Sequence, residues 1–213
     1  MEKLDYEVIN HFGPSIFKVK IPDRILKELN DYIDNIVKDE QKSSNLDHGD
    51  RLVGDVTQEF KLENDFVAKN GWLKFLADCT GTWVWHEMGK KIKKFNLMST
   101  WVVRQFKNEY NPVHWHGGHV SGAGFLKLPS TFGTHKQKKP SKDYLGGNLQ
   151  LLNGTRMFMA NSKYNIEPQV GNFYLFPSYM MHTVYPFKDS EEERRSISFN
   201  ATIDEDIYNV YGN

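Results

Sequence analysis

The sequence has a single cysteine, no long apolar run and no excess of either charge, and each absence narrows the possibilities. Cys79 alone cannot form an internal disulfide or a cysteine-based metal framework, so we expect a reducing compartment, the cytoplasm. Because no run of about 18 apolar residues is present, we expect no helix that spans a membrane. Lys and Arg number 27, as do Asp and Glu, so general nucleic-acid binding is not expected either.

What the sequence does have is the length and composition of one globular domain. It has 213 residues, of which 39% are hydrophobic and 14% aromatic, enough for a sizeable core. We therefore predict one domain over residues 1–213. Residues 1–98 are expected to form a helical N-terminal support, and residues 99–205 a core of strands.

Helical periodicity dominates the N-terminal half. Residues 16–21 alternate apolar and polar side chains, which predicts a short strand, and apolar residues then recur at helical spacing over 23–38. Residues 41–56 are polar and rich in glycine, which predicts a loop that either covers a site or is a plain surface connection. A second helical region is predicted over 66–95, with Gly81 as a candidate break between two helices.

From residue 99 the pattern changes to short strand-like runs separated by Gly, Pro and Asn. The predicted strands are 101–106, 113–116, 122–128, 148–152, 156–160, 172–176, 183–185 and 196–203. This pattern is typical of a sandwich or jelly roll, so the predicted fold class is α+β, a jelly roll buttressed by N-terminal helices. The lysine-rich residues 131–144 are an insert, interpreted either as a substrate-contact loop for an acidic substrate or as a solvated loop.

The segment Val-His-Trp-His-Gly-Gly at residues 113–118 predicts half of a metal site. On a strand, His114 and His116 project from one face and Trp115 from the other. A third imidazole, His182, comes much later, ahead of a strand-like run. An iron(II) site with open positions requires three protein ligands on one face, and neutral imidazole is a good ligand. We interpret His114, His116 and His182 as iron ligands.

Arg194 is predicted to bind the carboxylate of a small acidic co-substrate. Its guanidinium is a fixed fork of donors that matches a carboxylate, in a contact worth about 1.5–3 kcal/mol. Ser196 lies two residues on, so it faces the same way in a strand and adds a hydroxyl. Alternation allows only one of two successive arginines to face the site, and the Arg-X-Ser register selects Arg194. Arg195 is then expected to point outward and pair with the glutamates at 191–193.

Two alternatives for the third ligand stay open at this point. His119 follows two glycines, which allow the chain to fold back, so it is a candidate to replace His116. Otherwise it lines the pocket or caps its own strand. Glu109 is a candidate carboxylate ligand from the loop before the pair, or else a solvated turn residue. The histidines at positions 11, 48 and 135 lie in polar contexts and are predicted to be at the surface, and His86 is predicted to be a partly exposed helix residue.

Taken in order, these motifs resemble the 2-oxoglutarate and iron(II)-dependent oxygenase superfamily, in its prolyl hydroxylase-like branch. Similar His-X-His sequences occur in uncharacterised, phage-type members of that superfamily. The resemblance covers about residues 99–203. The stretches that carry it are 101–106, His114-X-His116, 121–126, Gly-Gly-Asn-Leu at 146–149, 170–178 and Arg194-X-Ser196.

The resemblance implies a double-stranded β-helix and an enzyme that uses Fe(II), 2-oxoglutarate and O2 to hydroxylate a substrate. It implies that Arg194 and Ser196 bind 2-oxoglutarate, and that Gln105 hydrogen-bonds it where prolyl hydroxylases often carry tyrosine. It leans weakly to a peptidyl or amino-acid target. His116 stands where the family usually has Asp or Glu. Two rival functions are a three-histidine, cupin-like dioxygenase without 2-oxoglutarate and a non-catalytic jelly-roll binding protein. Nothing in the sequence indicates the oligomeric state.

Overall fold

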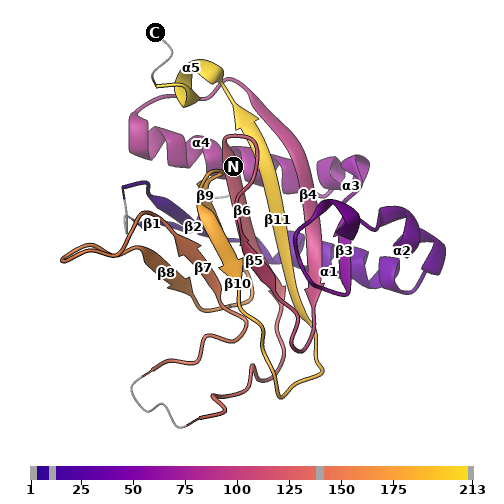
Figure 1. Cartoon of the computed structure of the whole chain (residues 1–213). Coiled ribbons are helices and arrows are strands. Elements are labelled where there is room, and N and C mark those ends of the chain that lie inside the picture. The colour runs from indigo at the N-terminus through magenta and orange to yellow at the C-terminus, as the bar shows by residue number, and fades with distance from the viewer. Residues whose placement is uncertain (1–3, 10–12, 138–141, 211–213) are drawn as a thin grey trace.

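The computed structural model describes residues 4–9, 13–137 and 142–210 as two antiparallel sheets with helices on one side (Figure 1). The larger sheet has the order β1-β2-β9-β6-β11-β4-β3, and the smaller one β5-β10-β7-β8. The larger sheet's strands are β1 Tyr6–Ile9, β2 Ile16–Lys20, β9 Asn172–Pro177, β6 Val120–Lys127, β11 Arg194–Ile203, β4 Phe95–Gln105 and β3 Gln58–Lys61. Those of the smaller sheet are β5 Asn111–His114, β10 Met181–Val184, β7 Leu149–Leu152 and β8 Lys163–Ile166.

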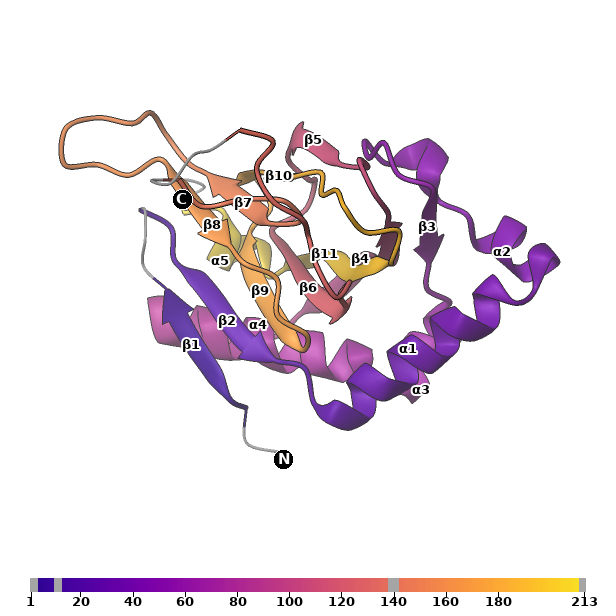
Figure 2. The ribbon, with the colours of Figure 1, turned by 90° about the horizontal axis from the view of Figure 1, so that it is seen from below.

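Helices α1 Asp23–Val37, α3 Asn64–Lys69 and α4 Trp72–Met88 cover the face of the larger sheet that lies away from the smaller sheet (Figure 2). Helix α2 Glu40–Leu46 lies near β3 at the edge of this sheet, and α5 Glu205–Tyr208 follows the end of β11. Helix α1 buries Ile25, Leu29, Ile33 and Ile36, which recur every three or four residues and so form one stripe. The α+β jelly roll with N-terminal helices is confirmed. Among the described helices, none is long and apolar enough to cross a membrane.

The larger sheet separates two hydrophobic cores. One core lies between the sheet and the helices and contains Trp72, Phe173 and Phe199. The other lies between the two sheets and contains Phe125 and Phe176. The central strands are therefore close-packed on both faces, so they form a well-packed support for a site at their ends.

Two helical predictions are wrong in their details. Residues 41–56 are not simply a loop, because α2 begins at Glu40, and the Asp39 carboxylate caps it by accepting from the Lys42 N–H at 3.0 Å. No residue of α2 is buried, so its sequence lacks the apolar stripe that marks a helix. Helix α4 continues through Gly81 without a break. The break lies instead at Gly71, whose φ of 87° is a left-handed conformation that glycine adopts easily.

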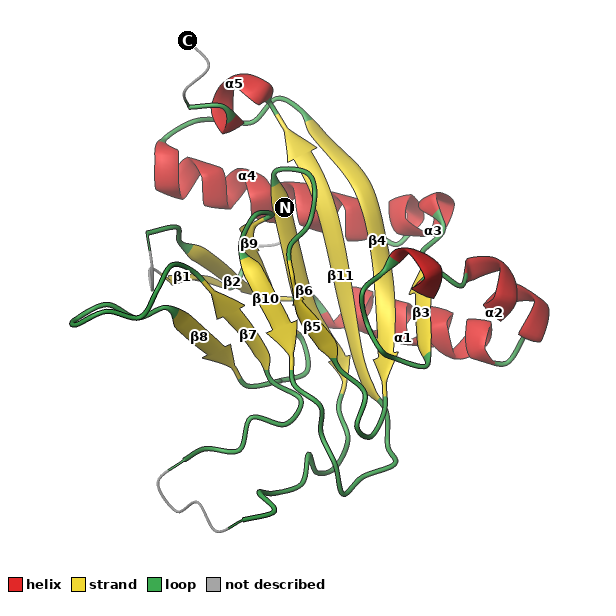
Figure 3. Ribbon diagram, viewed as in Figure 1, coloured by secondary structure: helices red, strands yellow, loops and turns green. Residues whose placement is uncertain are grey.

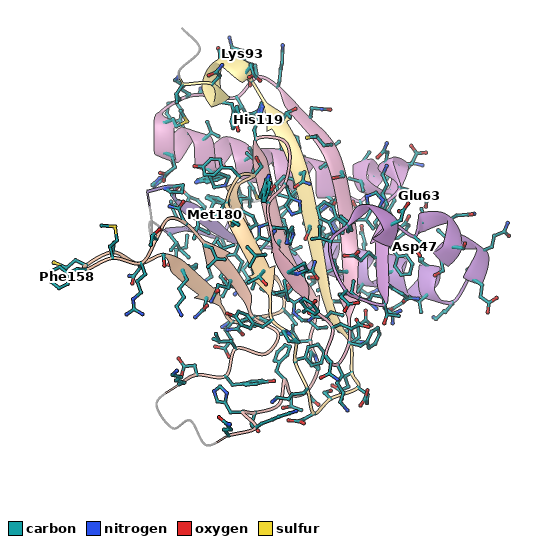
Figure 4. The ribbon with its side chains drawn as sticks, viewed as in Figure 1. Asp47, Glu63, Lys93, His119, Phe158 and Met180 are labelled. Atoms are coloured by element: carbon teal, nitrogen blue, oxygen red, sulfur yellow. The ribbon has the colours of Figure 1, made fainter. Side chains whose placement is uncertain are left out.

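The strand predictions miss in two ways. Residues 156–160 form a turn with a single bridge between Met157 and Ala160, not a strand. The apolar side chains there point to solvent, and Phe158, which is 94% exposed, lies at the tip of a projecting loop (Figure 4). Conversely, β1, β3 and β8 were not predicted, since each has four residues and alternation over so few is weak (Figure 3).

The insert at 131–144 has no regular secondary structure in its described part. Lys138 and Lys139, two of the four lysines that motivated the substrate-contact interpretation, lie outside the described residues. Lys136 and Lys142 alone do not decide between that interpretation and a solvated loop.

Arg195 lies on the helix side of the larger sheet, and its environment differs from the prediction. It does pair with a glutamate, Glu193, whose Oε1 lies 2.7 Å from Nε, but it is buried under α1 rather than exposed. Its guanidinium also bonds to Asp34 at 2.6 Å. Burial would raise the pKa of Glu193, but hydrogen bonds from Arg195 and Arg104 outweigh it and lower that pKa to about 2. The cluster is therefore a neutralised, buried network.

We predict that Arg195→Ala destabilises the protein by about 3–5 kcal/mol, because it leaves Glu193 buried without its main partner. Urea unfolding measures the loss. Arg24→Ala, which removes an exposed pair with Glu28, is the matched control and should cost less than about 1 kcal/mol. Equal losses in the two variants would contradict the burial argument.

Candidate metal centre

Strand pairing brings the three predicted imidazoles together at one end of the smaller sheet. His182 on β10 lies directly opposite His114 on β5. His116 follows β5, and its backbone N–H donates to the Ser178 carbonyl at 3.0 Å, which holds this segment against the β9–β10 turn. Each of the three histidines offers one ring nitrogen as a ligand atom, and these three nitrogens lie within 4.8 Å of one another. This is the group predicted from the His-X-His pair and the distant His182.

Backbone carbonyls fix the tautomers of two of the rings. Nδ1 of His114 lies 2.7 Å from the Pro112 carbonyl, and Nδ1 of His182 lies 3.0 Å from the Met180 carbonyl. Since a carbonyl only accepts, each Nδ1 carries the proton and each Nε2 keeps a free lone pair. Nε2 of His182 lies 3.2 Å from Nε2 of His116. The three rings thus present ligand atoms to one another at close range, and two of them have their Nδ1–H groups held by carbonyls, as metal-binding histidines do.

Burial of the three imidazole rings keeps them neutral. It lowers the pKa of His114, and it lowers those of His116 and His182 to about 4 and about 3, with a further contribution from neighbouring imidazoles. Two nitrogens bound at about 2.1 Å to one metal, at tetrahedral or octahedral angles, lie roughly 3.0–3.4 Å apart. The observed 3.2 Å matches this spacing. The donor set and its geometry therefore fit a divalent metal ion.

Neither alternative ligand belongs to this group. His119 lies towards α5 (Figure 4), where its Nδ1 accepts from the Ile203 N–H at 3.1 Å and its ring stacks on Tyr208. Glu109 bonds to the Phe106 N–H at 2.8 Å and to the Thr57 hydroxyl. Both side chains thus have local structural partners away from the three imidazoles.

Arg194 is buried, and it lines the same cavity as the three imidazoles. Its Nε donates to the Gly147 carbonyl at 2.9 Å, its Nη1 to the Ser196 hydroxyl at 3.2 Å, and it lies over the Phe125 ring. No carboxylate pairs with it among the described residues. Burial without a counterion lowers its pKa to about 9. The cavity thus contains a cation that lacks an anion.

The cavity itself lies between the two sheets. The larger sheet contributes Val103, Phe125 and Ser198, and the smaller sheet contributes Leu149 and Val184. Its volume is about 40 Å³, little more than a water molecule or two, so a small acid must widen it on binding.

Gln105 does not line this cavity. Its side-chain nitrogen donates to the carbonyls of Glu109, at 2.5 Å, and Tyr185, at 3.2 Å. These contacts hold the β4–β5 connection against the segment after β10. They give Gln105 a structural part, while its side-chain oxygen has no hydrogen-bond partner among the described residues. The expected contact between Gln105 and the co-substrate stays a prediction.

Sequence reasoning overlooked Glu59. Strand register aligns Ser196 on β11, Val103 on β4 and Glu59 on β3 in one row, and opposed residues of an antiparallel pair share a face. Glu59 is 1% exposed, and neither carboxylate oxygen has a hydrogen-bond partner among the described residues. Burial, with a smaller effect of Asp47, raises its pKa to about 7. The only signal in the sequence was a glutamate between polar and apolar residues of a four-residue strand.

Comparison with known proteins agrees with this geometry. Residues 99–200 match the family described as "Putative 2OG-Fe(II) oxygenase". Over these residues the chain is similar to 2-oxoglutarate and iron(II)-dependent oxygenases. The description of that family names Fe(II) and 2-oxoglutarate, the metal and co-substrate expected from the motifs. A search of curated proteins gives no match.

Solved structures share the fold of this chain at low sequence identity. A prolyl-4-hydroxylase from Pseudomonas putida is 13% identical, with a TM-score of 0.52 over 92% of this chain and 91% of that one. A prolyl hydroxylase from Trichoplax adhaerens, in complex with a hypoxia inducible factor peptide, is 15% identical, with a TM-score of 0.52 over 98% and 87%. AviO1 from Streptomyces viridochromogenes is 12% identical, with a TM-score of 0.57 over 89% and 90%.

We predict that Glu59 makes the metal-free protein less stable as the pH rises. The pKa of its carboxyl is about 7 when folded and about 4.5 when unfolded, so the folded state binds the extra proton between these values. The contribution of this carboxyl to the free energy of unfolding is greatest below about pH 4.5. It falls by about 3 kcal/mol as the pH rises from there through 7. In Glu59→Gln this loss disappears, so the variant is the more stable protein at pH 8.

Urea unfolding at pH 5 and pH 8, with a chelator present, measures this difference. Glu167→Gln, at an exposed glutamate, is the control and should follow the wild type at both pH values. A stability difference between Glu59→Gln and wild type that does not change with pH would contradict the assignment.

Proposed function

We propose that His114, His116 and His182 hold the Fe(II) of this oxygenase and that Arg194, assisted by Ser196, binds the distal carboxylate of 2-oxoglutarate. The observation that carries the proposal is the buried Arg194 without a counterion, in the cavity that the three imidazoles also line. A three-histidine, cupin-like dioxygenase or a non-catalytic binding protein has no need for such a cation.

Charge balance supports a dianionic co-substrate. The usual family site has one carboxylate ligand, whereas the three imidazoles here are neutral. A divalent metal ion and the Arg194 guanidinium would therefore place three positive charges around one cavity. The two carboxylates of 2-oxoglutarate offset two of these charges. A site with an acidic metal ligand has one positive charge fewer, so it attracts a dicarboxylate less strongly than this site does.

The residues around the site have separable tasks. The Pro112 and Met180 carbonyls orient two imidazoles, and Phe125 and Leu149 shield the cavity from water. Ser196 accepts from Nη1 of Arg194, which leaves its own O–H free to donate to a carboxylate oxygen. With Fe(II), 2-oxoglutarate and O2 bound, the metal centre would supply the oxidising power that converts 2-oxoglutarate to succinate and CO2 and hydroxylates a substrate.

The structural neighbours bear on the substrate class. Two of the solved structures with this fold are prolyl hydroxylases, one of them bound to a peptide. This supports a peptidyl or amino-acid side chain as the target class.

We predict that anaerobic addition of Fe(II) and 2-oxoglutarate produces a visible metal-to-ligand charge-transfer band in wild-type protein. Arg194→Ala should lose the band at co-substrate concentrations that saturate the wild type. Arg24→Ala, which removes an exposed arginine, is the matched control and should keep it. Iron binding without a band in the wild type would refute chelation of 2-oxoglutarate and favour one of the two rival functions.

We also predict that Arg194 selects the second carboxylate. The wild type should bind 2-oxoglutarate about 10- to 100-fold more tightly than 2-oxopentanoate, which has the same chain without the distal carboxylate. Arg194→Ala should bind the two acids about equally, as titration of the same band at higher concentration will show. A preference that survives in the variant would place the carboxylate elsewhere.

A further inference from the structure

A second cavity, of about 120 Å³, adjoins the imidazoles of His114 and His116 on the β3 side. It shares these two histidines, Trp101 and Asn111 with the first cavity, so both spaces converge on the proposed metal centre. The first cavity contains a cation, Arg194. The second contains a carboxylate, Glu59, and no lysine or arginine whose side chain is described lines it.

Glu59 is the polar group of this cavity that lacks a partner. Its side chain is almost fully buried, and both oxygens lack hydrogen bonds within the described part of the chain. The charged group that contributes to its raised pKa, after burial, is another carboxylate, Asp47. A buried carboxylate left in this state is costly, so it is typical of a position that binds a donor from outside the protein.

Gly54 keeps the space beside Glu59 open. A Cβ at this position would lie 3.1 Å from Oε1 of Glu59 and 3.1 Å from Oδ1 of Asn111. Both atoms therefore border the same small space, which any other side chain at position 54 would fill. The backbone of Asn111 is held in place, because its main-chain carbonyl accepts from the Thr183 hydroxyl at 2.7 Å.

The remaining walls are aromatic and aliphatic. Trp101 is buried at the inner side, whereas Trp115 is 65% exposed and marks the outer side; Leu52 and Val53 complete the wall. Indole rings beside a carboxylate attract ammonium and guanidinium groups through both the ring quadrupole and a charge-assisted hydrogen bond. The cavity therefore suits a positively charged nitrogen on an apolar chain.

We propose that this cavity is the primary-substrate pocket and that Glu59 binds an ammonium or guanidinium group of the substrate. The inference rests on the proposed function, which places the reacting metal beside His114 and His116. It names the substrate class as a basic one, such as a free or peptidyl amino acid with a cationic side chain. Glu59 is thus a specificity-determining residue and not a metal ligand.

Calorimetric titration at pH 8 tests the pocket with N-butylguanidinium and its neutral isostere N-butylurea. The protein is kept anaerobic with Fe(II) and 2-oxoglutarate, and the titration is repeated on the metal-free protein. We expect the wild type to bind the cation at least tenfold more tightly than the urea. Glu59→Gln should lower the affinity for the cation to that for the urea. The exposed control Glu167→Gln should keep the preference.

A second variant tests the space rather than the charge. Gly54→Val should weaken binding of both compounds, because its side chain enters the space beside Glu59 and Asn111, although the variant retains the Glu59 carboxyl group. Equal affinity of wild-type protein for cation and urea would overturn the inference, as would an unchanged preference in Glu59→Gln.

The charge-transfer band separates this inference from the proposed function. If the wild type shows the band and Glu59→Gln keeps it without losing the cation preference, only the inference fails. If the wild type shows no band, the proposed function fails, and the metal-free titration still decides whether Glu59 selects cations. Loss of iron binding in Glu59→Gln would make Glu59 a metal ligand and overturn the inference.

Discussion

Two successive arginines on β11 face opposite sides of the larger sheet, and the contrast between their surroundings underlies the site. Both are buried, and burial of a charge costs several kcal/mol unless an opposite charge compensates it. Arg195 is compensated by Glu193 and Asp34 on the helix side. Arg194, on the cavity side, bonds to a carbonyl and a hydroxyl and lies over the Phe125 ring, and no carboxylate of the described residues pairs with it. In our proposal the carboxylate of the co-substrate provides the missing negative charge.

The three imidazoles and Glu59 extend the same electrostatic argument. Neutral ligands leave the full charge of a metal ion in the cavity, and Arg194 adds to it. A buried carboxylate without a hydrogen-bond partner among the described residues, Glu59, lines the second cavity and does not belong to the three-histidine group. Positive charge would thus gather where we place a dianion, and negative charge where we place a basic substrate. One strand row, from Ser196 through Val103 to Glu59, spans both regions.

Sequence reasoning succeeded where side chains alternate with period two. His114 and His116, or Arg194 and Ser196, share a face in any strand, so their pairing follows from spacing alone. His182 could be joined to them only through the expected jelly roll, because its pairing with His114 is set by sheet topology. Helix α2 and Glu59 escaped prediction for a related reason: the helix buries no residue, and β3 has four residues. Their roles depend on neighbours that local sequence does not specify.

The most direct test of the account is a crystal structure of the protein with Mn(II), in place of Fe(II), and 2-oxoglutarate. The account predicts an anomalous peak within bonding distance of Nε2 of His114, His116 and His182, with one carboxylate of the acid on Arg194. It also predicts that the cavity between the sheets is wider than its present 40 Å³. A metal bound by Glu59 or by other residues, or an acid whose distal carboxylate does not contact Arg194, would contradict it.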